Sequence, residues 1–150
     1  MTMPPAAPAP GYNDAPMPPE RMLKTNRSLG LFVLLSIVTF GIYAIVVHYE
    51  MTESMNAITR RTGKPFLNFI LVLLLSAVTF GIYFYVWNHM FSDRADDESR
   101  RRGLFPAVKA TDFWLWGVLG SLIIVGPFVY LHKLFTAMNA LSVNYNQYGA

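Results

Sequence analysis

Three histidines stand where apolar sequence gives way to polar sequence, and imidazole is the side chain here with the widest range of chemistry. His48, His89 and His132 each follow an uncharged segment. Three imidazoles are enough to bind a metal ion, and two can ligate haem. The sequence lacks the i,i+4 and His-x-x-Glu-His spacings of a metal-binding helix. We therefore interpret these residues as interfacial side chains with one wet edge, and we predict no metal and no cofactor.

The other polar residues do not form an enzyme site. The chain contains no Cys, which excludes disulfides, thiolate ligands and a Cys nucleophile. Nucleophile elbows, phosphate-binding loops and dinucleotide-binding loops do not occur in the sequence. Acidic residues precede arginines by four positions, an order that stabilises a solvated helix; the pairs are Asp96–Arg100, Asp97–Arg101 and Glu98–Arg102. We predict no catalytic residue and no enzymatic activity.

The composition points to a membrane protein. Of the 150 residues, 53% are hydrophobic and 14% are charged, about half the charge content of a typical soluble domain. The apolar residues form three uncharged segments, at 29–47, 66–87 and 113–131, each close to the ~20 residues that cross a bilayer as a helix. We predict an all-α membrane protein with a lipid bilayer as its partner. The net charge of +3 is too small to indicate a nucleic-acid partner.

The first two segments belong to an internal repeat of 40 residues, which pairs residues 31–63 with residues 71–103. Each copy has an apolar run, the motif TFGIY, a polar helix, a basic end and a glycine that we expect to cap the helix. The third unit, at 113–142, is divergent and carries a small-residue break instead. The motif positions are Thr39, Phe40, Gly41, Ile42 and Tyr43, then Thr79, Phe80, Gly81, Ile82 and Tyr83, and in the third unit Gly126 and Pro127.

The TFGIY motif has two interpretations. In the first it packs helices together, because Ala77 and Gly81 have the small-xxx-small spacing that lets helices approach closely. In the second it forms a hinge or lines a polar path. An oligomeric pore would then be lined by the hydroxyl side chains of Ser36, Thr39, Ser76, Thr79 and Ser121.

Two topologies fit the three segments. We favour three single crossings with kinks, because bent backbone facing lipid is costly; the distribution of Lys and Arg then places the N-terminus in the cytoplasm. The repeat argues for a second arrangement, since identical units that each cross once would face opposite ways. In that arrangement each segment is a wedge that enters and leaves on one side. Its bent backbone must then be hydrogen-bonded within the protein.

The rest of the chain frames this membrane domain. Residues 1–26 are rich in proline, which prevents helices and sheet ladders, and we expect a disordered, polyproline-II-rich tail there. The membrane domain is predicted at 27–142, and residues 143–150 are expected to form a C-terminal tail.

The sequence resembles the bacterial membrane family catalogued as domain of unknown function 4234. The similarity rests on a basic residue before an apolar run that ends in Ser-x-x-Thr-Phe-Gly-Ile-Tyr; the matching stretches are Arg27 to Tyr43 and Leu71 to Tyr83. The resemblance implies an integral membrane protein, here of the bacterial inner membrane, and supplies no catalytic or binding residues.

The predicted role is structural or regulatory. We expect a scaffold that binds lipid or other membrane proteins, or a homo-oligomer. The first alternative is a channel-like or transporter-accessory subunit. The second is a membrane immunity or exclusion protein that occludes its partner.

Overall fold

The computed structural model describes residues 17–62, 64–104 and 108–150, and these residues form helices and no strands, so the all-α prediction is confirmed for this part of the chain. In chain order the elements are α1 (Leu29–Val38), α2 (Ile42–Ile58), α3 (Phe69–Val78), α4 (Ile82–Arg101), α5 (Ala110–Asp112), the π-helix η1 (Phe113–Val118), the 3-10 helix η2 (Leu119–Ile123) and α6 (Gly126–Tyr148).

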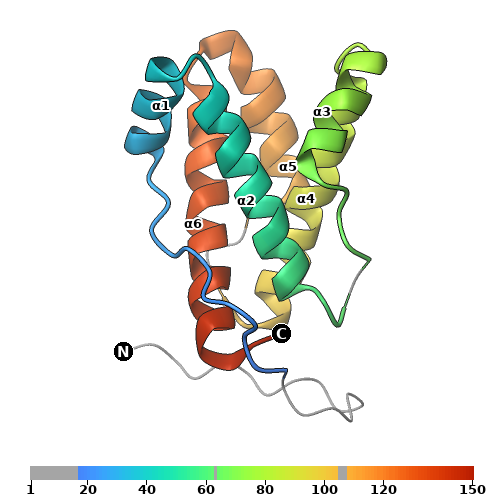
Figure 1. Ribbon diagram of the computed structural model, residues 1–150. Helices are drawn as coiled ribbons and strands as arrows, with labels where there is room; N and C mark the ends of the chain where they lie inside the picture. The colour runs from blue at the N-terminus through green and yellow to red at the C-terminus, as the bar shows by residue number, and fades with distance from the viewer. Residues whose placement is uncertain (1–16, 63, 105–107) are drawn as a thin grey trace.

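Each predicted apolar segment is divided into two helices by a turn. The breaks fall between α1 and α2, between α3 and α4, and between η2 and α6. At each break the chain reverses, so that a short arm packs on a long helix, and the three turns lie together at the top of Figure 1. The wedge arrangement therefore describes the path of the chain, and continuous kinked helices do not. Among the described residues, no helix combines the length and the apolar character needed to cross a membrane.

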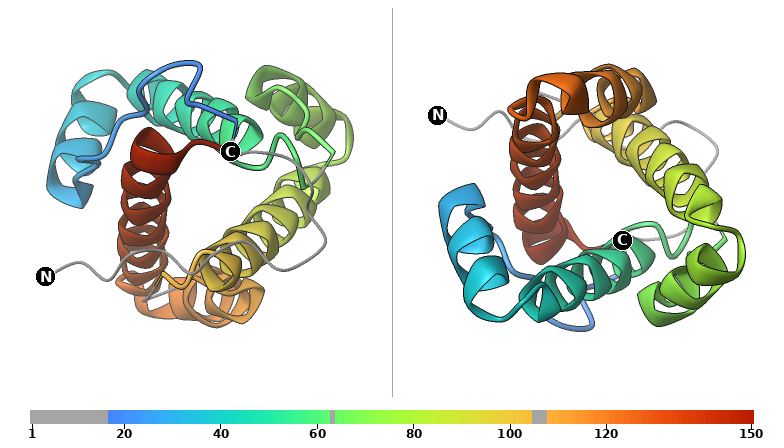
Figure 2. Two further views of the ribbon diagram at one scale, coloured as in Figure 1. Left: turned by 90° about the horizontal axis from the view of Figure 1, so that it is seen from below. Right: turned by 90° about the horizontal axis from the view of Figure 1, so that it is seen from above.

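The three hairpins close into a ring. The long helices α2, α4 and α6 surround a common axis, with the short arms outside them (Figure 2). Each short arm packs on its own long helix and also on the long helix of the neighbouring hairpin: α3 contacts α2, α5 contacts α4, and α1 contacts α6. Because the first hairpin contacts the last, the third unit completes the arrangement that the two repeats begin.

Below the turns, the long helices share a packed core. Its fully buried apolar side chains come from all three of these helices, and the largest are Met51, Met55, Ile58, Trp87, Phe91, Leu134, Met138, Leu141 and Tyr145. Large apolar side chains fill the axis between the three helices, and their burial stabilises this half of the molecule.

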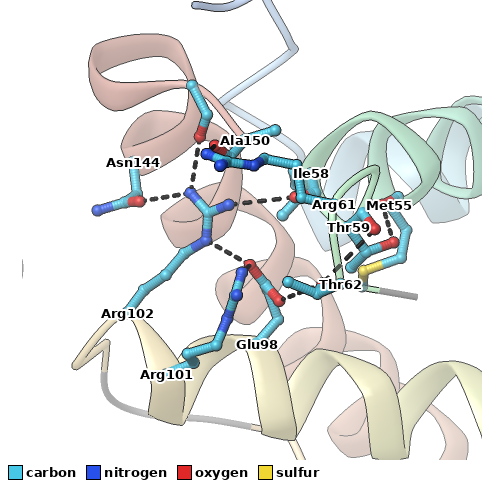
Figure 3. A network of polar contacts seen from close by, with 11 residues as sticks. Met55, Ile58, Thr59, Arg61, Thr62, Glu98, Arg101, Arg102, Asn144 and Ala150 are labelled. Atoms are coloured by element: carbon cyan, nitrogen blue, oxygen red, sulfur yellow. Dashed lines mark hydrogen bonds and ion pairs between the residues drawn. The ribbon is translucent and has the colours of Figure 1, made fainter. Parts of the chain in front are cut away.

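A buried arginine ties the long helices together at the end opposite the turns (Figure 3). Arg102 donates to the Oε1 of Glu98 (2.6 Å), to the Oδ1 of Asn144 on α6 (2.7 Å) and to the backbone carbonyl of Ile58 on α2 (3.1 Å). Glu98 is only 3% exposed. An ion pair this deeply buried needs all of these partners, because an unpaired charge in the interior is costly.

Asparagine side chains hold the extended segments that precede two of the short arms. Asn56 of α2 accepts from the backbone N–H of Phe66 (2.7 Å) and donates to its carbonyl (3.3 Å). Asn139 of α6 makes the same two bonds with the backbone of Arg27 (2.9 and 3.0 Å). Asn146 repeats them with Leu23, at 2.7 and 2.8 Å. Each amide thus replaces the partner strand that an extended segment would otherwise need.

The structure bears on the predicted helix caps and ion pairs of α4. Gly103 has a φ of +67° and caps α4 as expected, whereas Gly63 lies outside the described residues. The ion pairs Asp96–Arg100 (3.0 Å) and Glu98–Arg102 (2.6 Å) form. The predicted Asp97–Arg101 pair does not, because Arg101 turns to Glu98 instead (2.7 Å).

The predicted tails differ from the structure where it describes them. Residues 143–148 belong to α6, although the sequence analysis assigned them to a C-terminal tail, because they complete the helix face that carries Asn144, Tyr145 and Asn146. Of the N-terminal tail, residues 1–16 lie outside the described part. The segment that follows lies along α6, and Leu23 in it is buried.

Candidate functional site

The end of the bundle that carries the three turns exposes large apolar side chains. Phe40 is 98% exposed and Phe80 is 97% exposed, and Ile124 occupies the same position in the third hairpin at 78%. Apolar neighbours on the arms surround them; those more than half exposed are Leu34, Ile37, Val38, Ile42, Leu74, Val78, Ile82, Leu119, Leu122, Ile123 and Val125. We call this surface the apolar end. A contiguous apolar patch on this scale marks an interaction surface.

Charged residues do not reach the apolar end. The stretches 28–49, 65–92 and 113–131 contain no Asp, Glu, Lys or Arg, and the turns lie near the middle of each. Exposed aromatic rings lie between the turns and the nearest charged residues of the helices; they are Tyr49, Tyr85, Trp114 and Trp116. The molecule therefore has an apolar end, a belt of aromatic side chains and a charged end.

The first turn places Phe40 at its tip by a Schellman arrangement. The N–H of Gly41 donates to the carbonyl of Ser36 (2.7 Å), and the N–H of Phe40 donates to that of Ile37 (3.2 Å). This geometry gives Phe40 a φ of +51°, in the left-handed region that usually holds glycine or asparagine. A bulky ring at this strained and almost fully exposed position contributes little packing to the fold.

Thr39 completes the hydrogen bonding of this turn. Its hydroxyl donates to the carbonyl of Leu35 (2.7 Å) and accepts from the N–H of Tyr43 (2.9 Å), so that it ends α1 and begins α2 at once. Together with the Schellman bonds, this gives every N–H from residue 39 to residue 43 a partner within the turn.

The second turn repeats the first. Thr79 donates to the carbonyl of Leu75 (2.8 Å) and accepts from the N–H of Tyr83 (3.0 Å). The N–H of Gly81 donates to Ser76 (2.6 Å), and the φ of Phe80 is +53°. Two copies of one sequence motif thus produce the same turn with the same exposed phenylalanine.

The third turn also has a residue with a positive φ at its tip, but it uses different residues and different backbone hydrogen bonds. Ile124 has a φ of +59°, and its N–H donates to the carbonyl of Ser121 (3.2 Å). Gly126 and Pro127 begin α6, one residue beyond the turn, where the missing N–H of proline costs nothing. Gly126 packs against Gly120, and a Cβ on either residue would come within 2.8 Å of the other's backbone.

Within the described chain, the glycines of the motif have no helix packed against them. A Cβ at Gly81 would meet nothing within 4 Å, so the predicted close approach at the Ala77–Gly81 pair does not occur inside this fold and stays a prediction for association between molecules. Gly41 and Gly81 each have a φ of +88°, which an L side chain adopts at a cost. Glycine is required here by the conformation of the turn. The close contact between small residues is that of Gly120 with Gly126.

The hydroxyl side chains considered for a polar path bond within their own hairpins. Thr39, Thr79 and Ser76 each donate to a backbone carbonyl one turn earlier (2.7, 2.8 and 2.6 Å). Ser121 bonds likewise to Val118, and the Ser36 hydroxyl is buried without a partner among the described residues.

The three histidines lie apart. His48 stacks on Phe69, with 5.1 Å between the ring centroids, and burial lowers the pKa of its imidazole. His89 accepts a hydrogen bond from the Trp114 indole (3.0 Å), and His132 is exposed on α6. In the described ranges, no group of His, Asp and Glu side chains is arranged to hold a metal ion.

A buried polar cluster links α4 to α6 below the turns. The Tyr130 hydroxyl lies 2.8 Å from that of Ser92 and donates to the Oδ1 of Asn88 (3.3 Å). Burial raises the pKa of Tyr130 far above its usual range, so the group stays neutral. Asn88 in this cluster is 2% exposed.

The sequence identifies the motif residues, but it does not predict that Phe40 and Phe80 lie exposed at the tips of the turns. The repeat identified Phe40 and Phe80, yet only their positive φ and near-complete exposure single them out from the rest of the motif. The roles of Asn56, Asn139 and Arg102 depend on contacts between distant segments. The only feature of the sequence that could have indicated these residues is the presence of a polar side chain at a given position of a repeat unit.

Comparison with known proteins bears on the first two hairpins. No curated protein and no solved structure matches the chain. Residues 27–97 match the model of a family described as "Domain of unknown function (DUF4234)"; the match covers the first hairpin and most of the second, and stops before the third. The resemblance seen in the TFGIY motif is thereby confirmed over residues 27–97.

Proposed function

We propose that the protein is a membrane scaffold whose three hairpins enter one leaflet of a bilayer from one side. The observation that carries this proposal is the pair of phenylalanines held almost fully exposed at the tips of hydrogen-bonded turns. Water penalises such side chains, while acyl chains accept them. The occupant that fits three separate apolar tips at one end of a molecule is a fluid of acyl chains.

The dimensions support one leaflet. α1 and α3 have ten residues each, which gives each arm a length of about 15 Å. The hydrocarbon core of a bilayer is about 30 Å thick, so the tips would stop near its midplane. The aromatic belt would then lie at the interface, where Tyr and Trp are enriched.

The hydrogen bonding of the turns supports the same proposal. A bent backbone in hydrocarbon is tolerated only if its polar groups are bonded inside the protein. The Schellman bonds and the threonine hydroxyl provide this for the N–H groups of residues 39–43 in the first turn, and for those of residues 79 and 81–83 in the second.

The charged end would form the working surface of the scaffold. All 12 Lys and Arg residues lie outside the three apolar stretches. By the positive-inside rule we place this end, with both chain termini, in the cytoplasm. We further propose that other membrane proteins dock on the charged end. A pore receives less support, because large side chains fill the axis of the long helices.

Cysteine accessibility tests the proposal directly, because the chain has no native Cys. Single cysteines at residues 62, 104 and 148 should all react with a membrane-impermeant maleimide from the cytoplasmic side only. Three single crossings would instead put residue 62 opposite residue 104, and that result would refute the single-sided wedge.

A further inference from the structure

Two clefts lie just beyond the aromatic belt, and the internal repeat makes them equivalent. The cleft on α2 has a volume of about 380 Å³ and is lined in part by Tyr49, Glu53 and Ser54. The cleft on α4 has a volume of about 520 Å³ and is lined in part by His89, Asp93 and Arg94. These residues correspond one to one at the 40-residue offset, so the repeat reproduces a cleft as well as a turn.

Each cleft combines carboxylates with cations. Glu53 faces the α2 cleft together with Glu50, Arg21 and Lys24, and both of these cations are exposed. Asp93 faces the α4 cleft together with Asp97, Glu98, Arg94 and Arg101. The guanidinium of Arg94 lies 4.1 Å from the centre of the Phe66 ring and is thereby fixed in place.

The two carboxylates have no partner of their own. Across the described ranges, neither Glu53 nor Asp93 makes an ion pair or a side-chain hydrogen bond, whereas Glu50, Asp96, Glu98 and Asp112 are all paired. A carboxylate that faces a cleft beside a cation, but is not bonded to it, is free to bind a second positive group.

The position of the clefts along the long helices indicates the class of ligand. Glu53 and Asp93 each follow the first residue of their long helix by 11 positions, which is about 17 Å along the axis. The hydrocarbon of one leaflet is about 15 Å thick, and the headgroups lie outside it. The carboxylates of an inserted molecule therefore lie at the level of the headgroups.

We propose that each cleft binds the headgroup of a zwitterionic phospholipid with a primary ammonium, as in an ethanolamine lipid. The carboxylate of Glu53 or Asp93 would accept from the ammonium, and the neighbouring Lys24 or Arg94 would face the phosphate. Both are charge-assisted contacts, which are stronger than neutral ones. This inference rests on the proposed insertion into one leaflet and adds the class of lipid to it.

The experiment compares vesicles of phosphatidylcholine alone with vesicles that also contain phosphatidylethanolamine or phosphatidylglycerol. Protein is delivered from dilute micelles, and the bound fraction is measured by flotation. Ethanolamine lipid should tighten partitioning of the wild type about two- to fivefold for each cleft, the range measured for exposed ion pairs.

Matched variants separate headgroup recognition from a change in bilayer packing. Glu53→Gln and Asp93→Asn should each remove part of the ethanolamine gain, and the double variant should remove all of it while binding to phosphatidylcholine is kept. Glu20→Gln is the control, because Glu20 pairs with Arg60 and lines neither cleft; it should keep the full gain.

Three outcomes would overturn the inference: no ethanolamine gain in the wild type, an equal gain with phosphatidylglycerol, or a full gain in the double variant. Failure of the proposed function looks different, because the wild type would then not bind even pure phosphatidylcholine.

Discussion

The two ends of the bundle treat their side chains in opposite ways. At the charged end, Arg102 and Glu98 are buried and bonded to each other and to two other helices. At the apolar end, Phe40 and Phe80 are exposed and touch almost nothing. The charged end bonds its buried polar groups within the protein, whereas the apolar end leaves large apolar side chains exposed. This difference separates fold from proposed function along the bundle axis. The buried polar network at the charged end stabilises the fold, and the apolar end is the surface proposed to contact acyl chains.

The largest expected effect comes from placing charge on the two tips. Phe40→Asp with Phe80→Asp should weaken vesicle binding at least ~100-fold, because a charge deep in a bilayer costs about 2.5–3.5 kcal/mol per residue. Helix content by circular dichroism should not change, since neither ring packs on the fold. Tyr148→Asp is the control: this aromatic residue is 48% exposed at the charged end and should bind as the wild type does. Equal losses from both ends would erase the contrast between them.

The next largest effect is expected at the charged end, where a substitution should lower the free energy of unfolding without changing vesicle binding. Arg102→Met leaves Glu98 buried without its main partner, which should cost about 3–5 kcal/mol. Denaturant unfolding in micelles measures this loss. Arg100→Met is the matched control on the exposed face of α4, because the Arg100 side chain is 55% exposed; it should lose far less stability than Arg102→Met. Comparable losses would mean that the buried network does not stabilise this end.

A single substitution should move stability and binding in opposite directions at the apolar end. Phe80→Gly removes a bulky residue from a positive φ of +53°, and this should stabilise the turn by about 1 kcal/mol. The same change removes an apolar side chain from the leaflet, which should weaken vesicle binding about tenfold or more. Thermal unfolding in micelles and flotation give the two readouts. A variant that binds as well as the wild type would show that Phe80 is not a lipid contact.

The smallest effect is expected at the base of the third hairpin. Burial alone would raise the pKa of Asp112, but hydrogen bonds from Lys133 and from the backbone of Lys109 outweigh it and hold the pKa below its usual value. A depressed carboxylate pKa stabilises the fold above the unfolded pKa, and this contribution is lost as the pH falls through the folded pKa. Asp112→Asn should therefore lower stability by under ~1 kcal/mol at pH 7. The difference from the wild type should disappear once the pH has fallen through the folded pKa of Asp112, as unfolding curves at pH 7 and in acid will show.

Local features of this fold follow from the sequence. The 40-residue repeat, the breaks at Thr39-Phe40-Gly41 and Thr79-Phe80-Gly81, and the cap at Gly103 are determined by residues a few positions apart. Whether a break kinks a helix or reverses it depends on whether the residue at the tip adopts a positive φ. Glycine is the residue expected to do so, and the tips carry Phe40, Phe80 and Ile124 instead. The sequence therefore does not predict the reversal.

Contacts between hairpins were beyond the reach of a single sequence. The asparagine bonds of Asn139 and Asn146, and the closure of α1 on α6, join segments that are far apart in the chain. The pairing of Arg101 with Glu98 in place of Asp97 depends on which face of α4 is buried. That face is set by the other two long helices, and the sequence of α4 alone does not specify it.

Depth measurement on the tips tests the central claim most directly. Nitroxide labels on single cysteines at residues 40, 80 and 122 of the reconstituted protein report collision rates with oxygen, which concentrates in hydrocarbon, and with a water-soluble nickel chelate. We predict high oxygen and low nickel accessibility at all three sites, whichever side of the membrane receives the chelate. High nickel accessibility at the tips would place them in water and contradict the account.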